Sequence, residues 1–564
     1  MPAPTTLTPL SKAIWMRHLL KPRLAPSLLG LMVALPLACQ VQAQEISFQI
    51  PAQSLTSALQ AFGQQSKLQV LYSPDQLKGL KSIAVRGSME PTVALQKLLG
   101  SSGVAYGVSG NTITITGRSE GGALELGATS VTGQQLGETT EGTGSYTTQS
   151  SSSSNRLNIA LKETPQAVTV ITQQRIADQK LSNLTDAMEA TSGITVVREG
   201  QGADSDAYYS RGFAITNFEV DGVPTSSRMD NYTQNTAMYD RVEVVRGATG
   251  LISGMGQPSA TINLIRKRPT ATPQASISGE AGTWDRYGTS VDVSGPLNDA
   301  GNIRGRMVLD YKNQHSWVDR YKQDTNLVYG ISEFDLNEST LLTLGFSYQT
   351  VHTNAPPRSG FPLFDSAGGR TDFKRSYNTA ANWSYYDHDQ TSYFASLEHQ
   401  FDNGWSAKLD FTRTENKYDS AIDFLSGNPD PVTGLGGVVI PNKFQGNPKQ
   451  NTIDAYVTGP FEFLGREHEL IAGMQLSQIR NTNAPDYGGW MRAWTGYNGN
   501  IGPIYDWDGG APKPNFEKKG EGDFKENQYS AYLTSRWHLN DATSLILGGR
   551  LINWKQTDDV TYTA

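Results

Sequence analysis

The fold is decided by one stretch, residues 239–269, which reads YDRVEVVRGATGLISGMGQPSATINLIRKRP. Residues 242–245 are β-branched around one acid, and residues 260–265 are apolar and alternating, so each segment predicts a strand. The glycines between them predict a tight crossing of the chain; they are Gly247, Gly250, Gly254 and Gly256. A dinucleotide-binding loop is the weaker interpretation, because that motif needs a third glycine and a following helix.

Length and composition set the class of protein. The chain has 564 residues, too many for one ordinary domain, so two to four domains are expected. Glycine is abundant, with 56 residues, and 24 Tyr and 10 Trp favour β structure. No apolar run is long enough for a transmembrane helix, so any crossing of a membrane must use a barrel.

The N-terminal residues 1–43 have the pattern of a secretory signal peptide. Four cations precede an apolar run at 28–38, and small residues end at Ala43. Removing this segment takes away Cys39, the only cysteine, so the mature chain is expected to have no disulfide and no thiolate metal site. It also leaves 43 basic against 54 acidic residues, which argues against nucleic acid as a partner.

Residues 44–118 predict a small α+β domain with the order β-α-β and then α-β-β. Its expected elements are a strand at 46–50, a helix after Ser54, a strand at 68–72, a helix at 93–99 opened by Pro91, and a hairpin at 104–108 and 112–116 around Gly110-Asn111. The pattern FQIPAQSLTSALQAF at 48–62 resembles the short N-terminal domain shared by secretins and signalling TonB-dependent receptors. The resemblance implies a periplasmic signalling domain.

Residues 119–158 are rich in Gly, Ser and Thr and predict a flexible linker. A β-prone island inside it could add an edge strand to a partner's sheet. Its place between two domains resembles that of a TonB box, the segment pulled by the energy-coupling protein TonB. The residues of this predicted TonB box are Leu126, Gly127, Ala128, Thr129, Ser130, Val131 and Thr132.

Residues 159–270 alternate short strand and helix signals and end in the stretch quoted first. In order and spacing they closely resemble the plug of TonB-dependent outer-membrane receptors, which implies a mixed α/β domain inside a barrel. The predicted structural motif of this plug consists of Arg211, Gly212, Asp221, Gly222, Arg241, Glu243, Arg246, Gly247, Gly250, Gly254 and Asn263. Charged side chains of the stretch quoted first are expected to face inward barrel acids such as Glu333, Asp335 and Glu398; they are Arg241, Glu243, Arg246, Arg266, Lys267 and Arg268.

Residues 271–564 repeat alternating segments of about ten residues, which predict an antiparallel transmembrane β-barrel. Within 341–350, Leu342, Leu344 and Phe346 share one face, and polar residues share the other. Short turns such as 298–302 alternate with long polar segments, which we place at 354–390, 420–450 and 481–525. A soluble sandwich also alternates, but its turns would be more even in length.

The number of barrel strands is about 11 by this count, whereas the family that the plug resembles has 22. An open sheet in lipid would leave two unpaired edges, which is not viable. We therefore expect the chain to be a truncated piece of the barrel protein.

No catalytic constellation stands out, and none is predicted. The histidines lack zinc-protease spacing, and no Ser-His-Asp set lies on a nucleophile elbow. Aromatic residues are instead concentrated in the long segments, where they could grip an amphipathic ligand. The predicted ligand-binding residues are Tyr232 of the plug and Trp383 and Tyr386 of the barrel; no metal ligand is predicted.

Three further segments are similar to the ferripyoverdine receptors of fluorescent pseudomonads; they are ISFQIPAQSL at 46–55, FPLFDSAGGR at 361–370 and TGPFEFLGREHEL at 458–470. This resemblance implies an outer-membrane receptor that imports Fe(III) as a siderophore chelate, without a permanent cofactor. It also implies as partners the TonB complex, an inner-membrane anti-sigma regulator and outer-membrane lipid. The alternatives are a receptor for another ferric siderophore, a plugless porin, and a secretin.

Overall fold

The structure is a computed structural model. It describes residues 46–562 apart from 67–68, 72–76, 78–79, 90, 100–103, 110–111, 119–138, 152, 155, 158, 199, 202–205, 227–234, 248–253, 255 and 495. The predicted signal peptide, the predicted TonB box, Tyr232 and Gly250 therefore lie outside the described residues. The chain divides into two compact units, Met1–Thr129 and Ser130–Ala564, which are described separately.

The first unit consists of two small sheets and two helices around one apolar core. Strands β1 (Ile46–Ile50) and β3 (Val85–Met89) form one sheet, and β2 (Gln69–Leu71), β5 (Thr112–Arg118) and β4 (Val104–Ser109) form the other. Helix α2 (Leu55–Ser66) begins after Ser54, whose hydroxyl accepts a hydrogen bond from the Ser57 amide at 3.2 Å. Helix α3 (Pro91–Leu99) completes the unit. Strand β3 was not predicted, because its five residues VRGSM include a central glycine and only two apolar side chains, and it becomes a strand by pairing with β1.

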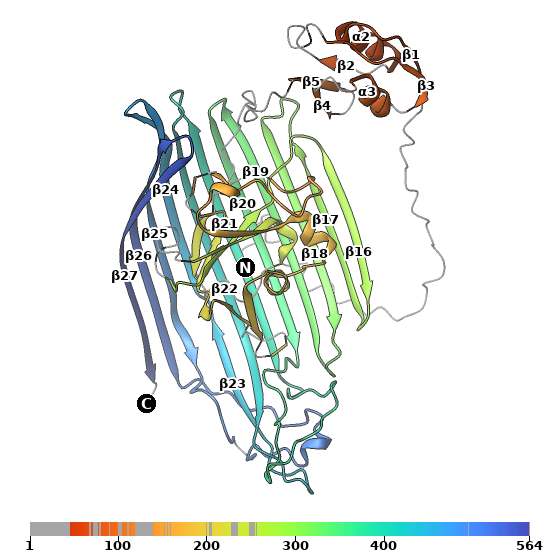
Figure 1. The fold of residues 1–564 in the computed structure, drawn as a ribbon. Helices are drawn as coiled ribbons and strands as arrows, with labels where there is room; N and C mark the ends of the chain where they lie inside the picture. Colours follow the sequence, from red (N-terminus) through yellow and green to blue (C-terminus); the bar gives the residue numbers. More distant parts are fainter. Residues whose placement is uncertain are drawn as a thin grey trace, which may run out of the picture. The chain divides into compact units, whose positions relative to one another are not determined.

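The second unit contains the plug (Figure 1), whose described residues form a five-stranded and a three-stranded sheet, preceded by the short pair β6 (Ser150–Ser151) and β7 (Ile159–Ala160). The larger has the order β13 (Val223–Ser226), β12 (Asn217–Val220), β15 (Ala260–Arg266), β14 (Tyr239–Arg246) and β8 (Ala167–Thr172). The smaller has the order β11 (Phe213–Ala214), β10 (Asp206–Ser210) and β9 (Ile194–Arg198). The strand–crossing–strand prediction for 239–269 is confirmed, since β14 and β15 are an antiparallel pair at the centre of the larger sheet.

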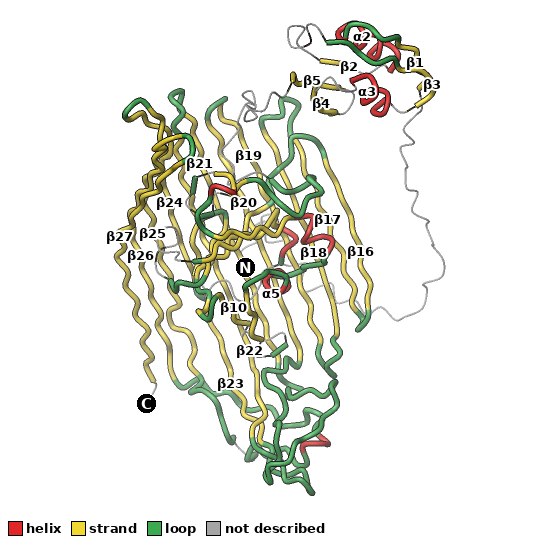
Figure 2. Tube along the Cα trace, in the orientation of Figure 1, coloured by secondary structure: helices red, strands yellow, loops and turns green. Residues whose placement is uncertain are grey.

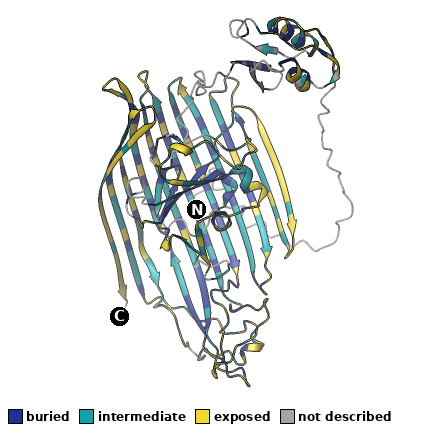
Figure 3. Cartoon of the chain, in the orientation of Figure 1, coloured by how far each residue is buried: buried dark blue, intermediate teal, exposed yellow. Residues whose placement is uncertain are grey.

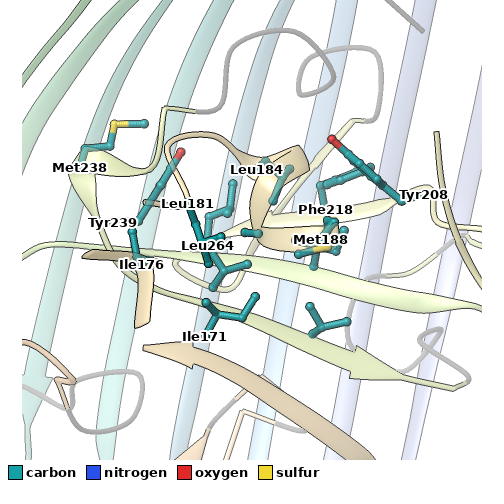
Figure 4. Close-up of a cluster of buried hydrophobic side chains, with 14 of the residues drawn as sticks. Ile171, Ile176, Leu181, Leu184, Met188, Tyr208, Phe218, Met238, Tyr239 and Leu264 are labelled. Carbon is teal, nitrogen blue, oxygen red and sulfur yellow. The ribbon is translucent and has the colours of Figure 1, made fainter. Parts of the chain in front are cut away.

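The plug core lies on one face of this central pair. Val242 and Val244 of β14 and Ile262 and Leu264 of β15 are fully buried. Helices α4 (Gln173–Asp178) and α5 (Leu184–Glu189) cover them, and Ile176, Leu184 and Met188 belong to the same buried cluster as Leu264 and Phe218 (Figure 4). Each fully buried aliphatic side chain contributes about 1.5–3 kcal/mol, so this face holds the plug together.

A twelve-stranded antiparallel sheet forms a curved wall with the plug on its concave side (Figures 1 and 2). In order its strands are β16 (Gln274–Gly282), β17 (Arg286–Pro296), β18 (Ile303–His315), β19 (Lys322–Asn337), β20 (Thr340–Asn354), β21 (Tyr385–Gln400), β22 (Ser406–Ser426), β24 (Lys449–Phe463), β25 (Arg466–Asp486), β26 (Gly520–Asn540) and β27 (Thr543–Tyr562). The remaining strand, β23 (Val438–Gly446), pairs with the C-terminal part of β22, residues 418–426. Strands β16 and β27 end the order and are exposed along their length (Figure 3).

The wall is apolar outside and polar inside, as the alternation predicted. On β20, Thr343 and Ser347 are buried towards the plug, whereas Leu344 and Phe346 are more than 40% exposed. On β22, Lys408 and Asp410 are buried and Leu409 is exposed. A water-soluble sheet would bury the apolar face, so this arrangement indicates a wall that faces lipid.

Short turns join the strands at one end of the wall, and long loops join them at the other (Figure 2). The long loops are shorter than predicted, because the strands continue well beyond the apolar belt. The expected loop 420–450 contains the end of β22, all of β23 and the first residues of β24, and 481–525 is strand at both ends. These extensions carry consecutive apolar residues, such as Ala421 and Ile422 of β22 and Val439 and Ile440 of β23, so they lack the alternation by which strands were predicted.

Candidate functional site

The polar face of the central plug strands carries a buried charge cluster. Nε of Arg241 lies 2.6 Å from Oε1 of Glu243, and its Nη1 lies 2.8 Å from Oδ2 of Asp240. The Arg241 side chain is only 2% exposed. Burial alone lowers the pKa of Arg241, but the attraction of Glu243 and Asp240 outweighs burial and holds the pKa above its ordinary value. The buried Arg241 guanidinium therefore depends on these neighbours to be stable inside the protein.

Hydroxyl and amide groups from residues 139–153 complete this cluster. The Thr140 and Glu141 amides donate to the Asp240 carboxylate at 2.8–3.1 Å. The hydroxyls of Ser151 and Ser153 donate to Oε2 of Glu243. We expected a flexible linker up to residue 158, and its described part from 139 onwards is instead packed against β14. Serines that cannot form an apolar core are here the donors that buried carboxylates require.

The same segment is tied to the wall at three places, and we call residues 139–163, apart from 152, 155 and 158, the strap. Glu141 accepts two hydrogen bonds from the Arg306 guanidinium of β18, at 2.5 and 2.6 Å. Arg156 pairs with Asp454 of β24 and donates to the Tyr532 hydroxyl of β26. Glu163 lies 2.8 Å from Nη2 of Arg536. The strap therefore crosses the lumen from β18 to β26 and is held by charge at each side.

Lys267 and Arg268, the last cations of the stretch 239–269, contact the wall, whereas the earlier cations of this stretch have their partners in the plug. Nζ of Lys267 lies 3.0 Å from Asp292, and Nε of Arg268 lies 2.5 Å from Glu333, with Glu398 at 4.0 Å. Arg266 pairs instead with Asp221 of the plug. The prediction that the plug charges face wall acids is confirmed for Lys267 and Arg268.

For the charges that precede Lys267 that prediction is wrong. Arg241 pairs inside the plug, as described above, and Arg246 reaches the Ser192 carbonyl and the Thr169 hydroxyl. Asp335 binds Arg304, a residue of the wall itself. The physical reason is distance along the sheet: Arg241 and Arg246 lie within β14, whereas residues 267 and 268 follow β15 and reach the wall.

Other residues of the predicted plug motif shape turns and crossings. Asp221 and Gly222 have positive φ and form the two-residue turn between β12 and β13, and Arg211 and Gly212 do the same between β10 and β11. A Cβ placed on Gly254 would lie 2.7 Å from the Gln528 amide of β26. The glycine-rich crossing therefore passes close to the wall, which explains the need for small residues there.

An outer cavity of about 270 Å³ lies between the plug and strands β17 to β21, at the end of the plug that meets the long loops. The Gln201 amide of this end donates to the Pro357 carbonyl at 3.0 Å. The cavity is lined by aromatic, amide and charged side chains; they include Arg198, Gln201, Asp206, Tyr208, Asn235, Arg286, Lys312, Gln314, Tyr321, Gln349 and Tyr386. Such a lining suits an amphipathic ligand rich in hydrogen-bonding groups.

Two titratable groups of the plug in this cavity are perturbed by burial. Burial raises the pKa of Asp206, against the opposing hydrogen bond from the Thr185 hydroxyl at 2.8 Å. Burial also raises the pKa of Tyr208 to about 12, so its hydroxyl stays protonated at neutral pH. The described residues bring no group of three or more His, Cys, Asp or Glu side chains together for a metal ion. The cavity therefore offers contacts to a ligand and not a metal centre among the residues described.

Three family models match the chain in succession. The Secretin and TonB N terminus short domain matches residues 68–118, the TonB-dependent Receptor Plug Domain matches 160–261, and the TonB dependent receptor-like beta-barrel matches 328–564. The chain is 42% identical to the ferripyoverdine receptor of Pseudomonas aeruginosa, over 99% of this chain and 68% of that protein. The chain belongs to the TonB-dependent receptor family.

Other relatives agree with this family. The receptor is 54% identical to the ferric-pyoverdine BN7/BN8 receptor of Pseudomonas putida, over 93% of this chain and 65% of that protein. The solved structure of the ferripyoverdine receptor of the outer membrane of P. aeruginosa bound to ferripyoverdine matches with a TM-score of 0.71 and 38% identity, over 92% of this chain and 67% of that chain. The chain spans about two thirds of the length of the curated relatives it matches.

The family settles the location of the protein and its class. TonB-dependent receptors lie in the outer membrane, and so does this receptor; they are transporters and not enzymes. Within the described part of the chain, no helix has the length and apolar character needed to cross a membrane. In outer-membrane barrels the short turns lie in the periplasm and the long loops outside, which places the outer cavity on the external side of the plug.

The predicted ligand residues occupy different places in the receptor. Tyr386 lines the outer cavity, and its ring stacks 5.7 Å from that of His388. Trp383 lies among the long loops, 6.0 Å from the ring of Phe516. Tyr232 belongs to the segment 227–234, outside the described residues, and Asn235 directly after it lines the cavity.

Most other loop aromatics pack against one another and away from this cavity. Trp494 and Trp507 join an apolar cluster with Leu425 and Val439, and Tyr505 stacks 5.2 Å from Phe373. These contacts hold the loops together. The polar lining of the cavity was not predicted. Residues such as Asp206 and Lys312 lie on strands far apart in the sequence, and no local sequence pattern shows that these strands come together.

Proposed function

We propose that the protein is a TonB-dependent importer of a ferric siderophore, of the ferripyoverdine type. The observation that carries the proposal is a plug fixed by ion pairs inside a lipid-facing wall, with a polar and aromatic cavity on its external side. Both relatives with the highest identity quoted above are named as receptors for ferric pyoverdine. The family resemblance sets the number of strands in the closed barrel at 22, which stays a prediction.

In this proposal the ligand contacts the outer cavity, with Tyr386 at its side and Tyr232 and Trp383 as further contacts. The siderophore chelates Fe(III), so the protein needs no metal ligands and no permanent cofactor. Amide and hydroxyl groups such as Gln314 and Thr350 can donate to and accept from peptide-like groups, while aromatic rings supply contact area. Arg286 and Lys312 favour acidic groups on the chelate.

Coupling to energy is proposed to run through the strap. TonB pairs with residues 126–132 as an added strand and pulls towards the periplasm. The first contacts to carry this force in the described chain are those of Thr139, Thr140 and Glu141 with Asp240 and Arg306. Their release uncovers the charged face of β14, which water can solvate once it is open. At these contacts the plug therefore moves by exchanging ion pairs for water.

The N-terminal domain is proposed to report occupancy of the receptor to an inner-membrane anti-sigma regulator. The match to a domain shared by secretins and TonB-dependent receptors supports a periplasmic interaction module. In the absence of coupling through residues 126–132, ligand binding should persist while transport stops.

The deciding experiment measures binding of ferric pyoverdine and of unrelated ferric siderophores to the receptor. Selective binding of ferric pyoverdine supports the proposal, and preference for another siderophore favours the alternative, a receptor of the same family with different loops. Relatives named for catecholate siderophores, such as the receptor Fiu of Escherichia coli at 28% identity, represent that class. Deleting residues 126–132 then separates binding from uptake; transport that survives this deletion overturns the assignment of the TonB box.

A further inference from the structure

Residues 378–384, at the end of the long loop between β20 and β21, lie where several long loops meet. The Asn378 side-chain amide donates to the Asp319 carbonyl at 2.8 Å. The Asn382 backbone amide donates to the Gly509 carbonyl at 2.9 Å. This segment, which we call the loop hub, therefore joins the loop between β18 and β19, the loop between β20 and β21, and the loop between β25 and β26.

A cation lies at the centre of the loop hub. Nη1 of Arg320 donates to the Ala380 carbonyl at 2.9 Å and to Oδ1 of Asn382 at 2.6 Å. Nη2 donates to the Asn378 carbonyl at 2.9 Å. A Cβ placed on Gly509 would lie 1.7 Å from Nη1, so only a glycine leaves room for the guanidinium there. Arg320 thus uses these donors on neutral oxygens of the hub and not on a carboxylate.

One carboxyl group is enclosed against the loop hub with few donors around it. Asp423, near the C-terminal end of β22, is fully buried. Its Oδ1 accepts a hydrogen bond from the Ala381 amide at 2.9 Å, and its Oδ2 has no hydrogen-bond partner among the described residues. A buried carboxylate is stable only when several donors or a close cation compensate for the loss of water. A neutral carboxyl group therefore suits this place better than a charged one.

The surroundings of Asp423 make it titrate near neutral pH. Burial raises the pKa of Asp423 to about 7, against the hydrogen bond from the Ala381 amide and the attraction of Arg320, which favour the charged form. Arg320 is itself faced by Asp508 and Asp319. Because the pKa is raised in the packed loops, the stability that Asp423 gives them is full below its ordinary pKa of about 3.9. That stability is lost as the pH rises through about 7.

The loop hub is connected to the mouth of the outer cavity. The Ala355 amide donates to the Ser384 carbonyl of the hub at 2.9 Å, and the Pro357 carbonyl, two residues further on, accepts from the Gln201 amide. The Ser316 hydroxyl donates to Oε1 of Gln201 at 2.9 Å. Gln201 lines the cavity, and both loops that hold it are held by the hub. Looser packing of the hub therefore frees the plug at the mouth of the cavity.

We propose that Asp423 is a proton-sensitive fastener of the long loops, which packs them over the outer cavity in acid and releases them when it is ionised. In its neutral form the carboxyl group stays buried against the Ala381 amide, and the hub stays closed. In its charged form it needs water, which reaches it only when residues 378–384 move away from β22. The long loops face the external medium, so the proton comes from that medium and returns to it.

A ligand should then reach the outer cavity more readily in a neutral than in an acidic medium. This consequence for the ligand rests on the proposed function, whereas the movement of the loops does not. The loops can be tested without any ligand, so a failure of the fastener and a wrong choice of siderophore give different results.

The test measures hydrogen exchange in the ligand-free receptor, as protection factors from which the intrinsic pH dependence of exchange is removed. Protection of the Ala381 and Asn382 amides should fall on the order of 100-fold between pH 5 and pH 8, because the pKa of Asp423 is about 3 lower when the loops are open. The Gln201 amide should lose protection over the same range, and constant protection there would contradict the connection to the cavity. Unchanged protection of the hub in the wild type overturns the proposal.

The variant Asp423→Asn keeps the shape of the side chain and an acceptor for the Ala381 amide, but it cannot ionise. Protection of its hub should change less than about threefold between pH 5 and pH 8. The matched control Asp372→Asn alters an exposed aspartate of the same long loop and should keep the full wild-type response. A wild-type response in Asp423→Asn, or a lost response in Asp372→Asn, overturns the proposal.

A direct titration separates loss of the proton from a misfolded hub. The infrared difference between the wild type and Asp423→Asn should contain the band of a protonated carboxyl group, which disappears with a midpoint near pH 7. The difference between the wild type and Asp372→Asn should lack that band. If the wild type shows no such band at pH 5, Asp423 is charged while the loops are packed, and the proposal is wrong.

Discussion

The plug and the wall use the same two-residue alternation and bury opposite faces. In the plug, Ile262 and Leu264 are fully buried and their neighbour Asn263 faces the polar strap. In the wall, Leu344 and Phe346 are more than 40% exposed and Thr343 is buried. The plug is thus stabilised by its own apolar core, whereas the wall depends on lipid to cover its apolar side.

The contact between these two regions combines an apolar patch, where Val308, Tyr329 and Ile331 of the wall join the plug core, with several ion pairs around it. Lys267, Arg268, Arg156 and Glu141 pair with wall residues one by one. Water can replace each partner when a pair opens, whereas an apolar seam would have to be exposed as a whole. The comparison therefore predicts that changes inside the plug are costly and that changes at the seam mainly alter its dynamics.

The largest effect is expected from Arg241→Met in the buried cluster. This change leaves the carboxylates of Asp240 and Glu243 buried without their cation, which costs about 3–5 kcal/mol. Denaturant unfolding followed by hydrogen exchange in β14 measures it. The control Arg246→Met, at the end of the same strand, should cost no more than about 1.5 kcal/mol. If both variants lose a similar free energy of unfolding, the buried charge cluster contributes no more to stability than the contacts of Arg246 at the end of β14.

Removing one leucine from each region tests the comparison directly. Leu264→Ala in the plug opens a closed cavity and should cost about 2–5 kcal/mol. Leu476→Ala on the wall should cost less than about 1.5 kcal/mol, because lipid chains can fill the space. Unfolding of the receptor in lipid bilayers gives both values. The contrast between plug and wall fails if Leu476→Ala is as destabilising as Leu264→Ala.

At the seam, Glu141→Gln should loosen one end of the strap. The Arg306 guanidinium keeps Asp292 at 2.7 Å, so only the two bonds to Glu141 weaken, by about 1–3 kcal/mol. Hydrogen exchange of residues 139–151 should be about tenfold faster or more, with siderophore binding unchanged. Glu163→Gln is the control at the other end, and it should leave the exchange of 139–141 as it is. An unchanged rate in the Glu141 variant would remove the strap from the coupling path.

The smallest effect is expected from Asp206→Asn in the outer cavity. Burial raises the pKa of Asp206 in the folded state. The folded protein is therefore most stable with Asp206 protonated, below the ordinary pKa of an aspartate. This stability is lost as the pH rises through the raised pKa, because the charged carboxylate is then buried. The variant should therefore unfold at a higher temperature than the wild type at pH 7, and the two should converge near pH 3. If the Asn variant is less stable than the wild type at pH 7, the charged carboxylate of Asp206 stabilises the fold, which contradicts this prediction.

Several features were predictable because their signals are local. The strands β14 and β15, the turns at Arg211-Gly212 and Asp221-Gly222, and the outward apolar belt all follow from period-two patterns and glycine positions. Strands β3 and β23 were missed, since β3 has a central glycine and β23 carries consecutive apolar residues, and each forms by pairing with a neighbour.

The candidate site was harder to predict than the fold. Only Tyr386 of the predicted ligand residues lines the cavity among those described, because aromatic composition cannot distinguish a ring that packs on Phe373 from one that faces a cavity. The polar members of the cavity come from the plug and five wall strands. Their closeness is a product of sheet curvature.

The sequence by itself determined the period of each strand, the order of the domains and the family, because these are properties of neighbouring residues and of motif order. Only the tertiary structure decided that the serine-rich strap is packed and where its charges go. Thr140 and Asp240 are 100 residues apart, and Arg156 and Asp454 are 298 apart. No local pattern encodes such a pairing, because a buried carboxylate is satisfied by whichever donors the folded chain brings within reach.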